Sequence, residues 1–95
     1  MSELEAVRKE IEEIDREILF LIDRRVNLAE KVLESKKING ILINDHKQNE
    51  VVISRALNAA TEMNLDVGSI KAIFEILIKM NIERQNELSG KGRLP

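Results

Sequence analysis

The chain has 95 residues, a net charge of −2 and no cysteine, and 43% of its residues are hydrophobic while 34% are charged. This length allows one domain, and the composition is typical of a globular chain rather than a disordered one. Zero cysteines exclude disulfides, thiol catalysis and thiolate metal sites, and a single histidine argues against zinc. We therefore expect neither a metal nor a cofactor.

Charge and hydropathy also narrow the classes of partner. With aromatic residues at 2% and an almost balanced charge, no base-stacking or strongly basic surface for nucleic acid is expected. No apolar run approaches the length of a membrane span, and the acidic first residues do not resemble a secretory signal. The expected location is the cytoplasm.

A long first helix is predicted over residues 3–37, with Ser2 and Glu5 as its capping box. Its apolar residues recur at alternating steps of three and four, which is the seam of a packed helix: Leu4, Val7, Ile11, Ile14, Ile18, Leu21, Leu28 and Val32. Such a helix is roughly 50 Å long, whereas a compact chain of this size has a radius of gyration of roughly 12 Å. The helix must therefore protrude, and its seam requires a second copy of the chain.

Two shorter helices are predicted after a break at 38–44, where Asn39-Gly40 is a turn signal. The second helix is capped by Asp45 and runs to about Met63, and the third is capped by Asp66 or Asn64 and runs to about Leu88. The predicted fold is therefore all-α, with a long, a short and a medium helix. One helical domain is expected over 1–90, with a disordered tail at 91–95.

Arg25 occupies the one position of the seam that holds no apolar residue. A guanidinium at a helix interface is costly unless an anion meets it. Lys36 lies 11 residues further on, on nearly the same helical face, and its Cα would be roughly 16 Å from that of Arg25. The anion is either a carboxylate of the protein or a small doubly charged ligand between the two cations, and the pattern leaves both open.

Amide side chains continue two of the apolar faces. Asn81 and Gln85 extend the inward stripe of Leu77 on the third helix, and Gln48 opens the buried face of the second. No nucleophile or general base accompanies these groups. A pocket of this kind binds and orients an anion, so catalysis there would depend on positioning and electrostatics.

Arg8 is 17 residues before Arg25, which corresponds to roughly 26 Å along a helix. It therefore cannot reach a small ligand held by Arg25 of the same straight helix. If two first helices pack antiparallel, Arg8 of one chain approaches Arg25 of the other.

Four segments carry a resemblance to a known family: VRKEIEEIDREILFLIDRR at 7–25, KVLESKK at 31–37, IND at 43–45 and LDVGSIKAIFEILIKMNIERQ at 65–85. The chain resembles the all-helical chorismate mutases of the small monofunctional type, from about Leu4 to Leu88. The resemblance implies an intertwined homodimer, joined through antiparallel first helices, that rearranges chorismate to prephenate without a cofactor.

The resemblance also implies roles for individual residues. Arg25 resembles the arginine that binds a substrate carboxylate, and Arg8 the arginine supplied to the partner chain's site. Lys36 resembles the lysine that contacts a carboxylate and the ether oxygen of the substrate, with Gln85 as the second donor to that oxygen. Asp45 matches a residue near the ring hydroxyl.

Three substrate-facing positions depart from the family pattern. Gln48 and Asn49 stand where Arg and Glu are common, and Asn81 stands where some relatives carry serine. Glu50 is about 100° further round the helix, so it is a poor replacement for the missing carboxylate. Three alternatives stay open: an isochorismate pyruvate-lyase on the same scaffold, a non-catalytic helical dimerisation module, and a regulatory domain that binds an aromatic amino acid.

Overall fold

The computed structural model describes residues 2–90, which form four helical segments. These are α1 (Glu3–Asn27), α2 (Ala29–Asn39), α3 (His46–Glu62) and α4 (Val67–Leu88). No strand occurs within the described residues, and the all-α prediction is confirmed. The tail predicted at 91–95 lies outside the described part of the chain.

Three of the helices begin at side chains that cap exposed backbone N–H groups. Ser2 Oγ accepts from the Glu5 N–H at 3.1 Å, and Asp45 Oδ1 accepts from the Gln48 N–H at 3.3 Å. Asp66 Oδ2 accepts from both the hydroxyl of Ser69 at 2.7 Å and its N–H at 2.9 Å. The hydroxyl bond, followed by the backbone bond, lowers the pKa of Asp66. Of the two caps predicted for the last helix, Asp66 is the one that forms.

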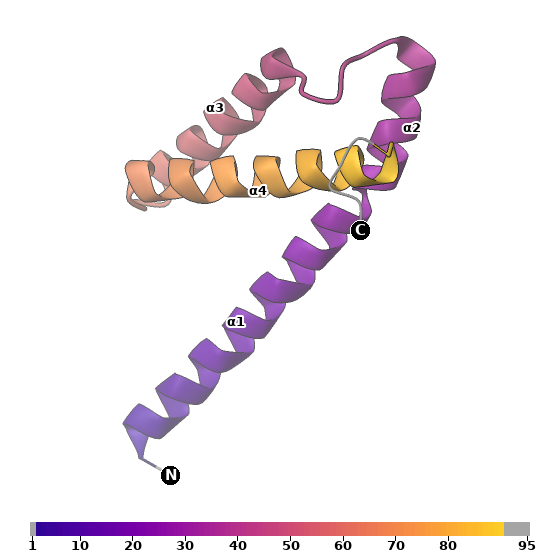
Figure 1. Cartoon of the computed structure of the whole chain (residues 1–95). Coiled ribbons are helices and arrows are strands. Elements are labelled where there is room, and N and C mark those ends of the chain that lie inside the picture. Colours follow the sequence, from indigo (N-terminus) through magenta and orange to yellow (C-terminus); the bar gives the residue numbers. More distant parts are fainter. Residues whose placement is uncertain (1, 91–95) are drawn as a thin grey trace.

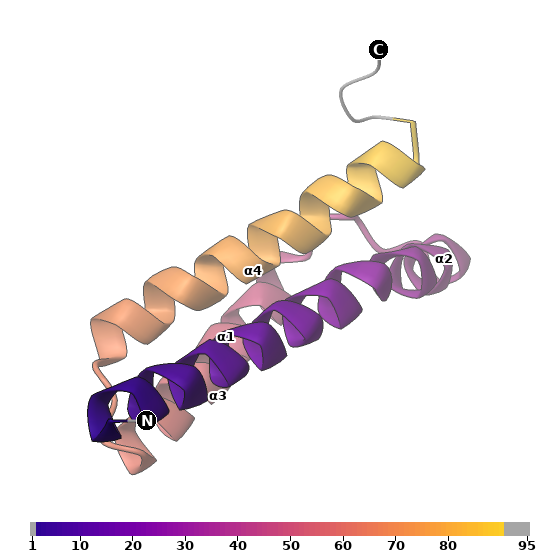
Figure 2. The same cartoon turned by 90° about the horizontal axis from the view of Figure 1, so that it is seen from below.

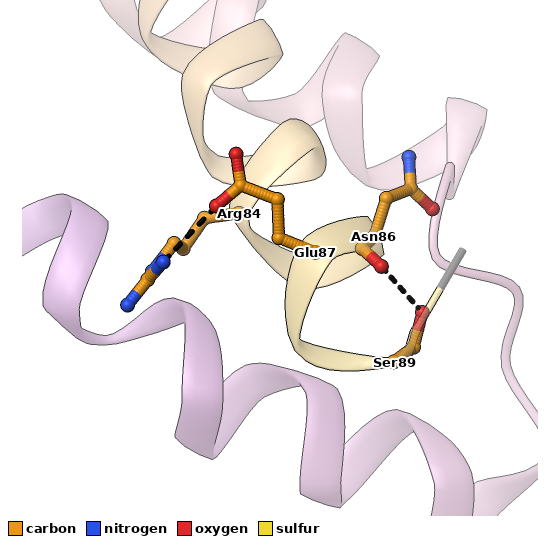
Figure 3. Close-up of polar contacts among 4 residues, drawn as sticks. All are labelled: Arg84, Asn86, Glu87 and Ser89. Atoms are coloured by element: carbon orange, nitrogen blue, oxygen red, sulfur yellow. Dashed lines mark hydrogen bonds and ion pairs between the residues drawn. The ribbon is translucent and has the colours of Figure 1, made fainter. Parts of the chain in front are cut away.

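The helix ends also follow local sequence. Gly40 ends α2 in the left-handed conformation, with φ of 68° that a residue bearing a Cβ rarely adopts. At the end of α4, the Ser89 hydroxyl donates to the Asn86 carbonyl at 2.9 Å, and Arg84 pairs with Glu87 at 3.0 Å (Figure 3). The predicted stops at Asn39-Gly40 and Ser89-Gly90 are confirmed.

The long first helix is not continuous, and the prediction of one helix over 3–37 is wrong at Leu28. That residue ends α1 and begins α2. The side-chain amide of Asn81 donates to the Arg25 carbonyl at 3.1 Å. In an unbroken helix this carbonyl would accept from the N–H of Ala29, and a side chain inserted into the hydrogen-bond ladder is a known cause of helix kinks. The kink turns α2 away from the axis of α1 (Figure 1).

α4 lies at the centre of the packed region and contacts each of the other three helices. The buried core is small and combines two residues of α2 with three of α3: Ala29, Leu33, Val52, Ala56 and Ala60. Alanines at these positions allow close approach of the helix backbones. α1 and α3 each contact α4 but not each other, so α4 links the end of α1 to α3.

α1 extends away from this packed region, with the N-terminus at its far end (Figure 1). It diverges from α4 in the view of Figure 1 although the two overlap in direction when seen from below (Figure 2), and it has no buried residue. The radius of gyration is 16.8 Å and the longest extent is 55 Å. This is well above the roughly 12 Å of a compact chain of the same length, and it agrees with the expected protrusion. Within the described residues, no helix is long and apolar enough to cross a membrane.

Candidate active site

A cavity of about 250 Å³ lies where the α1–α2 junction meets α3 and α4. Six polar side chains singled out in the sequence take part in its wall: Arg25, Lys36, Gln48, Asn49, Asn81 and Gln85. The remaining wall is aliphatic and comes from Leu28, Val32, Val52, Ile78 and Ile82. The fold therefore brings together residues that are up to 60 positions apart in the sequence.

Arg25 enters this cavity from the last turn of α1 and is partly buried. Its Nη1 donates to the Leu77 carbonyl of α4 at 3.0 Å. Burial, and then repulsion from Arg55 on α3, lower the pKa of the guanidinium. Both effects disfavour a positive charge at this position, so an anion in the cavity would relieve them.

Lys36 enters from the last turn of α2, where its Nζ donates to the Ile43 carbonyl. Burial lowers the pKa of the ammonium, and nearby Asp45 opposes that shift in part. Among residues 2–90 the ion pairs join Glu12 to Arg16, Lys79 to Glu83 and Arg84 to Glu87. Neither Arg25 nor Lys36 therefore forms an ion pair within the described chain, although Asp45 is close enough to Lys36 to stabilise its charge in part.

The two amides of α4 lie inward, as their positions in the sequence predicted. Gln85 is 1% exposed, which makes it the most deeply buried large side chain among the described residues. Its Nε2 donates to Asn81 Oδ1 at 2.6 Å, whereas its Oε1 is buried without a hydrogen-bond partner. Asn81 in turn donates to the Arg25 carbonyl at 3.1 Å.

The α3 residues occupy the mouth of the cavity. Gln48 and Asn49 belong to its wall, and Asn49 Nδ2 donates to Asn44 Oδ1 at 2.8 Å. Asp45 lies outside the wall and acts as the cap of α3, although it is close enough to Lys36 to influence its pKa. Glu50 also lies outside this wall, as its position round the helix predicted.

Arg8 is exposed on α1 and takes no part in this cavity, which agrees with the reach argument from the sequence. Arg55 is a residue that the sequence analysis missed. It follows Gln48 by seven residues and Val52 by three, so it shares their face of α3. That spacing could have placed Arg55 on the face of α3 toward the site. Its effect on Arg25 could not be predicted, because it depends on the hydrogen bond that holds Arg25 at the Leu77 carbonyl.

A larger groove of about 590 Å³ lies next to this cavity between α3 and α4, shares Asn49 and Ile78 with it, and includes Glu50, Lys71 and Glu75. Its two carboxylates and its lysine give it no excess of positive charge for a dianion. Within the described residues there is no group of three His, Cys, Asp or Glu side chains that could hold a metal ion. The smaller cavity is therefore the better candidate for a site that binds an anion.

The fold and the cavity together define a class of protein: a small all-helical protein with a cationic, amide-rich pocket and no hydroxyl, thiol or carboxylate side chain in the pocket wall. Such a pocket can hold a small anion in one conformation and donate hydrogen bonds to charge that develops on it.

Comparison with known proteins identifies the family. Residues 7–86 match the family described as chorismate mutase type II. A chorismate mutase from Methanocaldococcus jannaschii is 38% identical over 87 residues, which cover 92% of this chain and 88% of the relative. The chain belongs to the chorismate mutase type II family, and the resemblance described above is confirmed.

Two further relatives are much longer proteins from Buchnera aphidicola, both named bifunctional chorismate mutase/prephenate dehydratase. One, from the subspecies Schizaphis graminum, is 28% identical over 90 residues, which cover 95% of this chain but 23% of the relative. The chain therefore corresponds to less than a quarter of the length of these bifunctional proteins.

Proposed function

We propose that this protein is a chorismate mutase, which converts chorismate to prephenate within the cavity bounded by Arg25, Lys36 and Gln85. The observation that carries this proposal is the pair of partly buried cations on one small cavity, neither of which forms an ion pair in the described chain. Membership of the family supplies the identity of the dianion.

The proposed reaction is an intramolecular Claisen rearrangement. The carbon–oxygen bond of the ether breaks as a carbon–carbon bond forms, and no proton or group leaves the molecule. The main requirement is that the flexible dianion be held in its compact diaxial form. Arg25 meets this requirement by fixing a carboxylate, since a positioned guanidinium lowers the entropy lost on reaching the transition state.

The second requirement is stabilisation of negative charge on the ether oxygen, which grows as the bond breaks. Lys36 and Gln85 are the two donors that we assign to this oxygen, with Lys36 also contacting a carboxylate. Donors already in place stabilise the transition state more than the ground state. Removal of one such donor typically costs about 3–4 kcal/mol of the activation free energy.

The amides of α3 replace the charged pair common in the family. In the proposed complex, Gln48 and Asn49 contact the substrate with neutral groups, and Asp45 lies near the ring hydroxyl. The hydrogen bond from Asn49 to Asn44 keeps the Asn49 side chain near this end of the cavity. A neutral mouth leaves Arg25 and Lys36 as the main cations for the substrate.

We also propose that the protein is a homodimer in which two α1 helices pack antiparallel. Support comes from six apolar residues on one face of α1 that are 46–58% exposed in the single chain: Leu4, Val7, Ile11, Ile14, Ile18 and Leu21. Burial of this face is favourable by about 25 cal/mol per Å². The same arrangement brings Arg8 of one chain to the cavity of the other.

The shared arginine makes a prediction. We expect the Arg8→Ala homodimer to lose at least tenfold in kcat/KM, because each cavity lacks one carboxylate contact. A mixed dimer of Arg8→Ala and Arg25→Ala chains should recover about half of the parent activity, since one of its two cavities then holds both arginines. Lys9→Ala, which changes an adjacent exposed cation, is the control. A fully active Arg8→Ala homodimer would refute the sharing.

The proposed activity is tested by following the ultraviolet absorbance of chorismate with purified protein, and by identifying the product with proton NMR. Formation of prephenate supports the proposal. Release of pyruvate from isochorismate, with no loss of chorismate, identifies the lyase instead. If neither substrate reacts while the protein is a folded dimer, the chain is a non-catalytic module.

A further inference from the structure

A chain of side-chain hydrogen bonds joins the backbone of α1 to Gln85. Asn81 Nδ2 donates to the Arg25 carbonyl at 3.1 Å, and Asn81 Oδ1 accepts from Gln85 Nε2 at 2.6 Å. Both bonds are partly buried, so water competes weakly for these groups. Asn81 therefore has its acceptor and one of its two N–H groups committed within the protein.

The Arg25 carbonyl determines which group donates and which accepts in each of these hydrogen bonds. A backbone carbonyl only accepts hydrogen bonds, so the end of Asn81 that faces Arg25 must be its NH₂ group. The other end of Asn81 is then an oxygen, and Gln85 must offer it a donor. If either amide alone turned over, two oxygens would face each other in a partly buried site, where unmade hydrogen bonds are most costly.

The orientation of the Gln85 amide leaves one of its own polar atoms without a hydrogen bond. Its Oε1 is buried and has no hydrogen-bond partner, which is unfavourable for an amide that is 1% exposed. Without Asn81, the amide would be free to turn and seek a partner for that oxygen. The bond at 2.6 Å holds the amide in place, and Nε2 keeps a second N–H that makes no hydrogen bond within the described residues. Gln85 belongs to the cavity wall, so this N–H is the one available to a ligand there.

We propose that Asn81 is a positioning residue, which makes Gln85 present its NH₂ group rather than its oxygen to the cavity. This inference rests on the proposed function, in which Gln85 donates to the ether oxygen of the substrate. It differs from the direct substrate contact that the sequence predicted for Asn81. We call the two hydrogen bonds that join the Arg25 carbonyl, Asn81 and Gln85 the relay. Its orientation is fixed at the Arg25 carbonyl, because a backbone carbonyl cannot turn over as a side-chain amide can.

A double-mutant cycle tests whether Asn81 acts through Gln85. We expect Asn81→Ala to lower kcat at least tenfold with KM changed less than twofold, because Asn81 does not hold the substrate. In a Gln85→Ala background, the same substitution should change kcat less than twofold. A loss that persists in that background, or a loss confined to KM, would overturn the inference. Asn86→Ala is the matched control on α4, with helicity and melting temperature measured for each variant.

Proton NMR of the Gln85 side-chain amide separates this inference from the proposed function. The signals are assigned by their loss in Gln85→Ala, and they should exchange slowly with solvent in the parent and at least tenfold faster in Asn81→Ala. Equal exchange in the two proteins would refute the relay even if the parent is an active mutase. A parent protein with slow exchange but no activity on chorismate would refute the proposed function and leave the relay supported.

Discussion

Arg25→Ala should lower kcat/KM for chorismate at least a hundredfold, which corresponds to about 2.7 kcal/mol of transition-state stabilisation. The guanidinium is partly buried, lies in the wall of the cavity and has no carboxylate partner within residues 2–90. An anion bound there interacts in a medium of low dielectric constant, so loss of the charge is poorly compensated by water. Arg24→Ala removes an adjacent exposed guanidinium and should leave kcat/KM within about twofold.

The same side chain also supports the fold, because its Nη1 donates to the Leu77 carbonyl. A loss of activity must therefore be separated from a loss of folded protein. Arg25→Lys retains a positive charge but not the planar group that pairs with a carboxylate through two bonds. We expect it to keep the helicity of the parent and to recover only part of the activity. A loss of less than tenfold for Arg25→Ala would defeat the assignment.

Lys36→Ala should lower kcat at least a hundredfold while the helical content stays unchanged. In the proposed mechanism, the ammonium donates to the ether oxygen as charge develops on it, so its removal affects the transition state more than the bound substrate. Lys37→Ala, at the next and exposed position of α2, is the matched control and should retain full activity. A reduction of less than tenfold would remove Lys36 from the mechanism.

The pH dependence of the parent enzyme gives an independent check on Lys36. Burial lowers the pKa of this ammonium below its ordinary value of 10.5. Because only the protonated form carries the charge and the proton to donate, kcat/KM should fall as the pH rises through the lowered pKa. Binding of a dianion favours the charged form, so the corresponding fall in kcat should occur at a higher pH. A kcat/KM that stays constant to pH 10.5 would contradict this role.

Local sequence was sufficient for the boundaries of most helices. Ser2, Asp45 and Asp66 cap through atoms of their own side chains, and each accepts from a backbone N–H three residues on. Gly40 ends α2 because of its own conformational freedom. These interactions span few residues, so the local residue pattern is enough to predict them.

The inward position of the site residues was also predictable, because helical periodicity places a side chain on one face whatever it later contacts. The hydrogen-bond partners of these side chains could not be predicted. Arg25 donates to a carbonyl 52 residues away, and Asn81 reaches back 56 residues to the backbone of Arg25. Nothing in the spacing of α1 predicted that Asn81 would interrupt the helix at Leu28.

What the sequence by itself determined about this protein is the set of helices, the face on which each polar residue lies and the family to which the chain is similar. Only the tertiary structure decided the kink between α1 and α2, the approach of Arg55 to Arg25 and the direction of the Gln85 amide. The physical reason is that periodicity and capping act within a few residues. A hydrogen bond between α4 and α1 depends on where the whole chain has placed both helices.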